Sequence, residues 1–178
     1  MPFHWDVRSA IGREDFLVAD SNRDAVIWLD KWPDWPQPAL VLSGPEGAGK
    51  SHLARVWQKQ ANAQLIQAAS LTLDNVPELA LRPLVIEDAE GVRTEQALLH
   101  LLNMLREAGL HLLMTARQPP ARWQVALPDL RSRLNALPVA SLQAPDDSLI
   151  AALLVKLFAD RQLRVGDDVI EFLVPRME

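Results

Sequence analysis

The sequence predicts an α/β fold in which a parallel five-stranded sheet lies between helices and a short helical region follows. Short, wholly apolar runs alternate with longer segments of helical periodicity, which is typical of parallel strands that are buried on both faces. Apolar residues make up 49% of the 178 residues, enough to form a packed core. After Pro145 the pattern is helical only. These observations together favour a single sheet-based domain followed by part of a helical one.

The strands are expected where apolar side chains run with little interruption, because a strand covered on both faces has no polar side. The weakest of the five has a Gln at each end, and the third runs directly into two acidic residues. In chain order the expected strands are Ala39–Ser43, Gln64–Gln67, Leu84–Ile86, Leu110–Thr115 and Pro138–Leu142.

The helices are expected where apolar residues recur every three or four positions and polar residues stand at the ends. Ser21 can cap a first helix that ends near Lys31, before a proline-rich connector. A second helix begins at Gly49 and ends near Gln60. The expected helices beyond it are residues 94–108, from the cap Thr94 to the stop Gly109, then residues 146–162, and a last one from about Asp167.

Composition excludes several classes of protein. The chain has 18 basic and 23 acidic residues, a net charge of −5, which argues against binding nucleic acid unaided. It contains no Cys, so disulfides, thiolate metal sites and a Cys nucleophile are excluded. The longest apolar run, Leu149–Val155, is far shorter than the roughly 20 residues of a membrane span. With no signal-like N-terminus, a cytoplasmic protein without membrane contact is expected.

A glycine-rich motif follows the first strand and matches G-x-x-x-x-G-K-[ST], the phosphate-binding loop. Glycines let successive backbone N–H groups point at phosphate oxygens, Lys50 reaches the outer phosphates, and the Ser51 hydroxyl can bind Mg²⁺. The alternative, an ordinary glycine-rich turn, is disfavoured because the motif lies between a predicted strand and a predicted helix. The expected nucleotide-binding residues are Gly44, Pro45, Glu46, Gly47, Ala48, Gly49, Lys50 and Ser51, with His52 directly after them.

Two acidic residues, Glu87 and Asp88, stand at the end of the third strand. Buried carboxylates are unfavourable without a cation, so one is expected to hold Mg²⁺ and the next to orient an attacking water. With Ser51 they form the expected metal site. The alternative is a pair of acids at the solvated end of a strand.

Arg131 and Arg133 flank Ser132 in a third polar segment. Taken alone, they are typical of a solvated face or of ordinary ion pairs. Their functional interpretation is an arginine finger, a cation offered to the γ-phosphate of a nucleotide. The four His residues are scattered and form no metal set, and the Trp residues are expected to pack in the core.

Taken together, the order and spacing of these segments resemble the AAA+ ATPases of the bacterial replication initiator DnaA group. Within that group, the chain is most similar to the Hda-like regulatory inactivators of DnaA. The segment of Phe16, Leu17, Val18 and Asn22 resembles the adenine pocket of the group. The other matching segments are residues 44–51 and 84–88, the sensor 1 segment 114–120, the segment 128–134 that ends at the finger, and the start of the helical lid from residue 145.

The resemblance implies an AAA+ domain over residues 1–143, with an extension over 1–15, and a partial, truncated lid over 144–178. It implies binding of ADP or ATP with Mg²⁺, and a finger at Arg133 that acts on ATP held by DnaA. The implied partners are DnaA and the DNA-loaded sliding clamp, and the chain can form a homo-oligomer. Arg117 stands where DnaA carries Asp, which implies weak intrinsic hydrolysis. Only Pro2 and Phe3 resemble the clamp-binding tag of the family.

Three other functions remain open at this point. The first is a DnaA-type initiator ATPase module without its DNA-binding domain. The second is a small-molecule kinase that uses the same phosphate loop, although Pro119-Pro120 and the trailing helices fit AAA+ proteins better. The third is a non-catalytic scaffold similar to a clamp loader.

Overall fold

The computed structural model describes residues 17–176 and contains a parallel sheet of five strands in the order β2-β3-β4-β1-β5. Every strand pair in it is parallel. The predicted α/β fold with a parallel five-stranded sheet is therefore confirmed. The strands are β1 (Ala39–Ser43), β2 (Gln64–Gln67), β3 (Leu84–Glu87), β4 (Leu112–Ala116) and β5 (Val139–Ser141).

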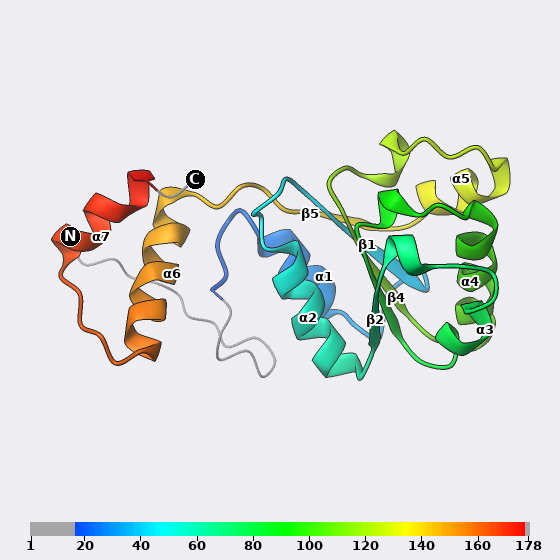
Figure 1. The fold of residues 1–178 in the computed structure, drawn as a ribbon, viewed down its shortest axis with the longest axis horizontal. Helices are drawn as coiled ribbons and strands as arrows, with labels where there is room; N and C mark the ends of the chain where they lie inside the picture. The colour runs from blue at the N-terminus through cyan, green and yellow to red at the C-terminus, as the bar shows by residue number, and fades with distance from the viewer. Residues whose placement is uncertain (1–16, 177–178) are drawn as a thin grey trace.

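Helices cover both faces of the sheet, with α1 and α2 on one face and α3, α4 and α5 on the other (Figure 1). Successive strand residues point to opposite faces, so Leu40 and Leu42 pack under α1 and α2, whereas Val41 packs toward α4. The wholly apolar strands follow from this two-sided burial. The helices are α1 (Arg23–Asp30), α2 (Lys50–Ala61), α3 (Val76–Leu79), α4 (Glu95–Glu107) and α5 (Pro128–Asn135), with 3₁₀ turns η1 (Ala68–Ser70), η2 (Ala89–Gly91) and η3 (Pro120–Arg122).

A cluster of aromatic rings fills the end of the sheet at which β1 and β4 begin. The rings of Trp35 and Trp57 stack at 5.4 Å between centroids, and Trp32 meets Trp57 edge-on at 5.9 Å. The His111 ring contacts Trp32 and Trp35 of this cluster edge-on. Burial lowers the pKa of His111, although a hydrogen bond with the backbone of Pro33 raises it in part. These Trp residues act in packing, as predicted.

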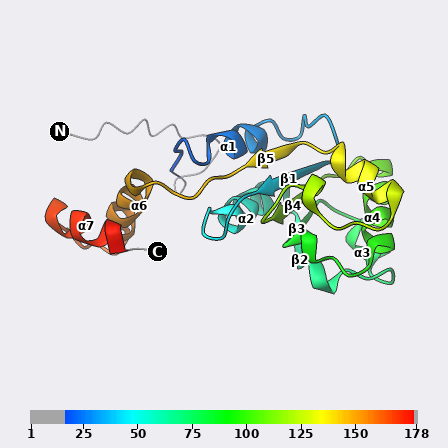
Figure 2. The same cartoon turned by 90° about the horizontal axis from the view of Figure 1, so that it is seen from above.

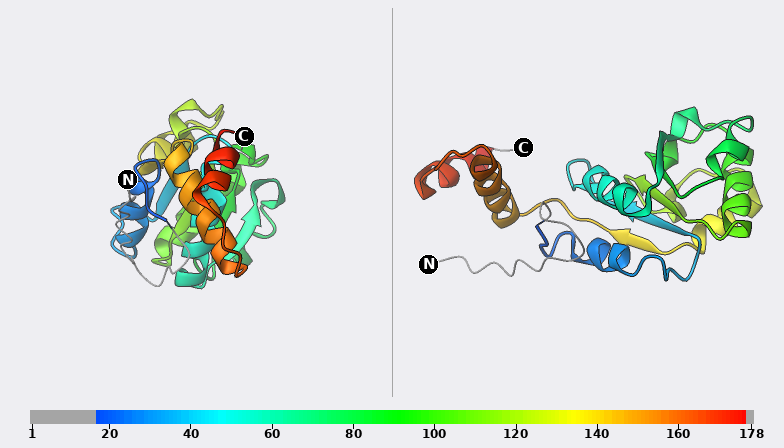
Figure 3. Two further views of the ribbon diagram at one scale, coloured as in Figure 1. Left: turned by 90° about the vertical axis from the view of Figure 1, so that its left-hand side faces the viewer. Right: turned by 90° about the horizontal axis from the view of Figure 1, so that it is seen from below.

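Two further helices, α6 (Asp147–Asp160) and α7 (Asp167–Leu173), follow the sheet, and the 3₁₀ turn η4 (Val174–Arg176) ends the described chain. They pack on each other through Leu154, Ile170 and Val174. Figures 2 and 3 show this helical pair at one end of the molecule, joined to the sheet by a thin connector. No helix in residues 17–176 has the length and apolar character that crossing a membrane requires.

Some boundaries differ from the predicted ones. The first helix begins at Arg23, because Ser21 and Asn22 lie in a turn. In this turn Asn22 Oδ1 accepts a hydrogen bond from the Ala19 N–H, and Asn22 Nδ2 donates one to the Leu17 carbonyl. The fourth strand begins at Leu112, two residues later than expected. Helix α5 was not predicted, and neither was the single turn α3.

The unpredicted helix α5 is capped from another part of the chain. Its N-cap residue, Leu127, has no side-chain oxygen, and the Glu95 carboxylate instead accepts the N–H groups of Ala126 and Leu127 at 2.8 and 2.7 Å. These two hydrogen bonds hold the pKa of Glu95 below its usual value. A cap that comes from 32 positions away leaves no local signal in the sequence.

Candidate functional site

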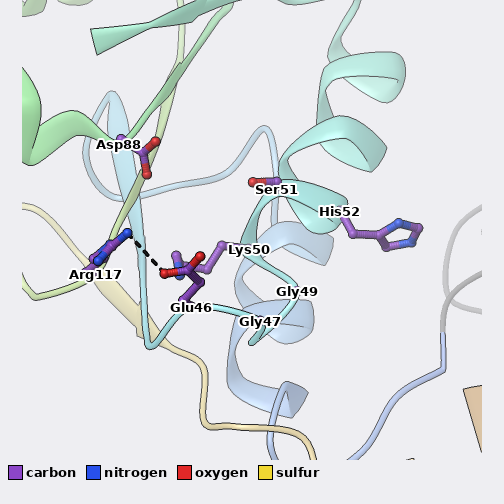
Figure 4. Close-up of a pocket in the computed structure, with 8 residues that line it drawn as sticks. All are labelled: Glu46, Gly47, Gly49, Lys50, Ser51, His52, Asp88 and Arg117. Carbon is purple, nitrogen blue, oxygen red and sulfur yellow. Dashed lines mark ion pairs between the residues drawn. The ribbon is translucent and has the colours of Figure 1, made fainter. Parts of the chain in front are cut away.

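A cavity of about 400 Å³ lies at the carboxyl ends of β1, β3 and β4, beside the start of α2 (Figure 4). Ligands of open parallel sheets bind at this edge, because the loops that leave the strands converge there. The residues that line the cavity are Glu46, Gly47, Gly49, Lys50, Ser51, His52, Asp88 and Arg117.

The loop from Gly44 to Gly49 requires glycine at specific positions. Gly47 and Gly49 have φ values of 77° and 89°, a conformation that strains other residues. At Gly44, a Cβ atom would lie 2.4 Å from the carbonyl oxygen of Leu142, so no side chain fits. The glycine pattern of the motif is therefore explained by the backbone path of the loop.

Lys50 is the first residue of α2 and is only 9% exposed. Its Nζ donates to the carbonyl oxygens of Gly44 and Pro45 at 2.7 and 2.6 Å, so the ammonium group lies against the loop. Burial lowers the pKa of Lys50, whereas the nearby carboxylates, that of Asp88 foremost, raise it. A cation at the N-terminus of a twelve-residue helix favours an anionic ligand.

The two predicted acids have different environments. Glu87 is 7% exposed, and its Oε2 accepts a hydrogen bond from Gln67 Nε2 at 2.7 Å, while Oε1 is buried with no hydrogen-bond partner in the described chain. Asp88 has a left-handed backbone with φ of 54°, and its N–H donates to Thr115 Oγ1 at 3.1 Å. Asp88 lines the cavity and Glu87 does not.

The oxygen ligands at the cavity fit Mg²⁺ bound together with a phosphate ligand. Within residues 17–176, no group of three or more acidic, His or Cys residues could hold a metal ion unaided. Mg²⁺ in proteins often uses one or two carboxylates plus the phosphates of its substrate. The Ser51 hydroxyl and the Asp88 carboxylate lie at the cavity, and the unpaired Glu87 Oε1 is a further carboxylate oxygen at the end of β3.

Arg117 directly follows β4, and its guanidinium lies in the cavity (Figure 4). Its Nη2 is 3.1 Å from Glu46 Oε2, and its backbone N–H donates to Glu90 Oε1 at 2.7 Å. Arg117 is not among the binding residues predicted from the sequence. The sequence feature that could have identified Arg117 as a site residue is its position directly after a wholly apolar strand, which matches the position of Asp88 after β3.

The described residues of the expected adenine-binding segment are Leu17, Val18 and Asn22. Phe16 lies outside the described residues. Val18 packs toward the core under α1 and α2, and Asn22 bonds the backbone of Leu17 and Ala19. None of Leu17, Val18 and Asn22 lines the cavity.

Four other predicted residues differ in their position at the cavity. Gly44, Pro45 and Ala48 belong to the loop but do not line the cavity. His52 does line it, although its ring points away from Lys50 and Asp88 (Figure 4).

The two arginines of α5 have different roles in the structure. Arg131 is exposed, as expected of a solvated face, and it also donates to the carbonyl oxygen of Val125 through Nε and Nη2, so it holds the loop before the helix. Arg133 has a side chain 36% exposed and pairs with Asp129 at 3.3 Å. Arg133 does not line the cavity.

No protein-family model matches the chain. It is 30% identical to the chromosomal replication initiator protein DnaA of Sphingopyxis alaskensis, over 94% of this chain and 42% of that protein. It is 26% identical to an uncharacterized protein of Haemophilus influenzae, over 93% of this chain and 75% of that protein. Its fold matches AMPPCP-bound DnaA from Aquifex aeolicus with a TM-score of 0.77 at 16% identity, over 96% of this chain and 62% of that one.

The chain spans 33 to 43% of the length of the DnaA relatives that it matches. The region that they share contains the phosphate-loop motif and the five-stranded sheet. The chain therefore has a DnaA-like AAA+ ATPase fold.

Proposed function

We propose that the chain is an AAA+ module that binds ADP or ATP with Mg²⁺ at the loop of residues 44–51. The observation that carries this proposal is the position of Lys50, a nearly buried cation at a helix N-terminus, inside a loop whose backbone admits only glycine at Gly44. The match to AMPPCP-bound DnaA supports it.

Four residues that line the cavity, Lys50, Ser51, Asp88 and Arg117, have distinct parts in the proposed binding. Lys50 exchanges its two carbonyl acceptors for phosphate oxygens, a charge-assisted interaction that is stronger than a bond to a neutral carbonyl. Ser51 and Asp88, which line the cavity, supply oxygens for Mg²⁺. When bound, Mg²⁺ neutralises charge on the phosphates. Arg117 adds a second cation beside Lys50.

Lys50→Ala tests the nucleotide site by thermal unfolding with ADP and Mg²⁺. The wild-type chain gains stability by mass action, about 2.7 kcal/mol when the ligand concentration is a hundred times Kd. The variant should gain no stability, because it lacks the Lys50 ammonium that contacts the outer phosphates. Lys59→Ala, in the exposed last turn of the same helix, is the matched control and should gain as much as wild type. An equal gain for Lys50→Ala would refute the site.

For the biological role, we propose a regulator of replication initiation that stimulates hydrolysis of DnaA-bound ATP together with the DNA-loaded sliding clamp. Two observations support this role. Arg133 lies on α5 outside the chain's own cavity, as a residue that acts on a partner's nucleotide must. This chain covers 75% of the Haemophilus influenzae relative but only 33 to 43% of the DnaA relatives, so a similar chain occurs in a protein shorter than the initiators.

A second candidate is an initiator module that acts as part of a DnaA-type protein, and the 30% identity to an initiator favours it. The nucleotide that co-purifies with the chain distinguishes the two. Bound ADP supports the regulator, whereas bound ATP supports the initiator module.

A further inference from the structure

We infer that Glu46 determines the specificity of the proposed nucleotide site, because its carboxylate competes with the ligand's phosphates for the Arg117 guanidinium. The inference rests on the proposed function and names a residue that tunes the same site. Glu46 is the third residue of the loop, and Arg117 comes from the end of β4, 71 positions along the chain from it. The two side chains meet across the cavity with Nη2 and Oε2 3.1 Å apart (Figure 4).

The backbone of Arg117 is held in place by a hydrogen bond. The backbone N–H of Arg117 donates to Glu90 Oε1 at 2.7 Å, so the residue is fixed to the turn after β3. Its side chain then extends into the same cavity as Lys50. A guanidinium can bind a phosphate group through two parallel hydrogen bonds, which makes it a suitable second cation for a polyphosphate.

In the structure, however, the loop itself supplies the anion that neutralises this cation. A phosphate group that binds Arg117 at Nη2 displaces the Glu46 carboxylate, and one that binds at the other N–H donors remains close to that carboxylate. The pair is exposed, with side chains 67% and 84% accessible, so the displacement is easy and the effect on affinity is moderate. The loss of affinity that Glu46 causes grows with the charge of the ligand. Both the weakened attraction between Arg117 and the phosphates and the repulsion between Glu46 and the phosphates increase with that charge.

The consequence is a preference for the less charged ligand. Neutralising Glu46 removes the competitor and leaves Arg117 available, so affinity should rise more for ATP than for ADP. For Glu46→Gln, we expect about three- to fivefold tighter binding of Mg·ATP and about one-and-a-half- to twofold tighter binding of Mg·ADP at low salt. Both gains should shrink at 0.5 M NaCl, because salt screens exposed charges.

The experiment measures Kd for ATP and for ADP, each with Mg²⁺, by isothermal titration of the full chain. Glu78→Gln is the matched control, since Glu78 is an exposed acid on α3 outside the cavity and its change alters net charge equally. Arg117→Gln should weaken both ligands, ATP more than ADP. In the Arg117→Gln background, Glu46→Gln should gain no more than about twofold, because the competition no longer exists.

Two results would overturn the inference, and they differ in what they say of the proposed function. If Glu46→Gln binds both nucleotides like Glu78→Gln, while wild type binds them and Lys50→Ala does not, Glu46 has no role in specificity and the nucleotide site stands. If the wild-type chain binds neither nucleotide, the proposed function fails and the inference fails with it.

Discussion

Gln67→Leu should destabilise the protein by leaving a buried carboxylate without a hydrogen-bond donor. Gln67 and Glu87 are register neighbours on β2 and β3, and Gln67 Nε2 donates to Glu87 Oε2 at 2.7 Å. Glu87 Oε1 has no hydrogen-bond partner in the described chain, so within it the bond from Gln67 is the carboxylate's one hydrogen bond. Replacing Gln67 with an apolar residue of similar size removes it.

The expected loss of stability depends on how buried the acceptor Glu87 and the donor Gln67 are. A hydrogen bond to a charged group contributes about 1.5–3 kcal/mol, and an orphaned buried acceptor costs a similar amount. Glu87 is 7% exposed, but Gln67 is exposed on an edge strand, so water can replace part of the lost bond. We therefore expect a loss of about 1.5–2 kcal/mol, which lowers Tm by roughly 4–6 °C for a domain of this size.

Thermal and urea unfolding measure the loss, and two variants provide controls. Gln64→Leu, at the other end of β2, makes the same chemical change away from any carboxylate and should cost much less. The double variant Gln67→Leu/Glu87→Leu should recover most of the stability, because two apolar partners leave nothing unpaired. If the double variant is less stable than Gln67→Leu, the carboxylate is not destabilised by the loss of its donor and the reasoning is refuted.

Two further predictions concern α5. Arg133→Ala should retain ADP binding but lose the stimulation of phosphate release from ATP-loaded DnaA with clamp on DNA, because an arginine finger accelerates hydrolysis by about 10³ to 10⁵. The control is Arg106→Ala, which changes an exposed arginine on α4 and should stimulate like wild type. Stimulation by Arg133→Ala equal to that by wild type would exclude the finger. Glu95→Ala should lower stability at neutral pH, because the cap of α5 is lost. The folded-state pKa of Glu95 is depressed, so its contribution is present above the unfolded pKa of about 4.3 and is lost as pH falls through the folded value. The unfolding curves of wild type and Glu95→Ala should therefore converge in acid, and a difference that persists there would contradict the capping role.

The parts of the structure that could be predicted from sequence depend on local patterns. Strands β1 and β3 were predictable because burial on both faces demands uninterrupted apolar residues. The phosphate loop was predictable because its backbone path requires glycine, and Lys50 follows at a fixed spacing. Both signals are contained in a few consecutive residues.

The remaining features arise from contacts between distant segments. The Glu46–Arg117 pair joins a loop to a strand end, and no spacing rule connects the two residues. The predicted acids Glu87 and Asp88 are adjacent, yet a left-handed backbone at Asp88 gives them different surroundings, which adjacency could not indicate. Arg131 is exposed as expected, but its hydrogen bonds to the Val125 carbonyl exist only in the folded loop and could not be predicted.

The end of β5 ties the helical pair to the proposed nucleotide loop. The Leu142 N–H donates to the Ser43 carbonyl at 2.7 Å, and the Gln143 N–H donates to the Ser21 carbonyl at 2.9 Å. Only Ala144 and Pro145 remain between this anchored stretch and the cap of α6 at Asp146. Such a tether is short and has one φ angle fixed by proline.

The Ala144–Pro145 tether leaves little free chain between the helical pair and the end of β5. The same strand end lies against the phosphate loop, because the Leu142 carbonyl leaves no room for a side chain at Gly44. The positions of α6 and α7 are therefore restricted by the stretch of chain that also contacts the first residue of the loop around Lys50.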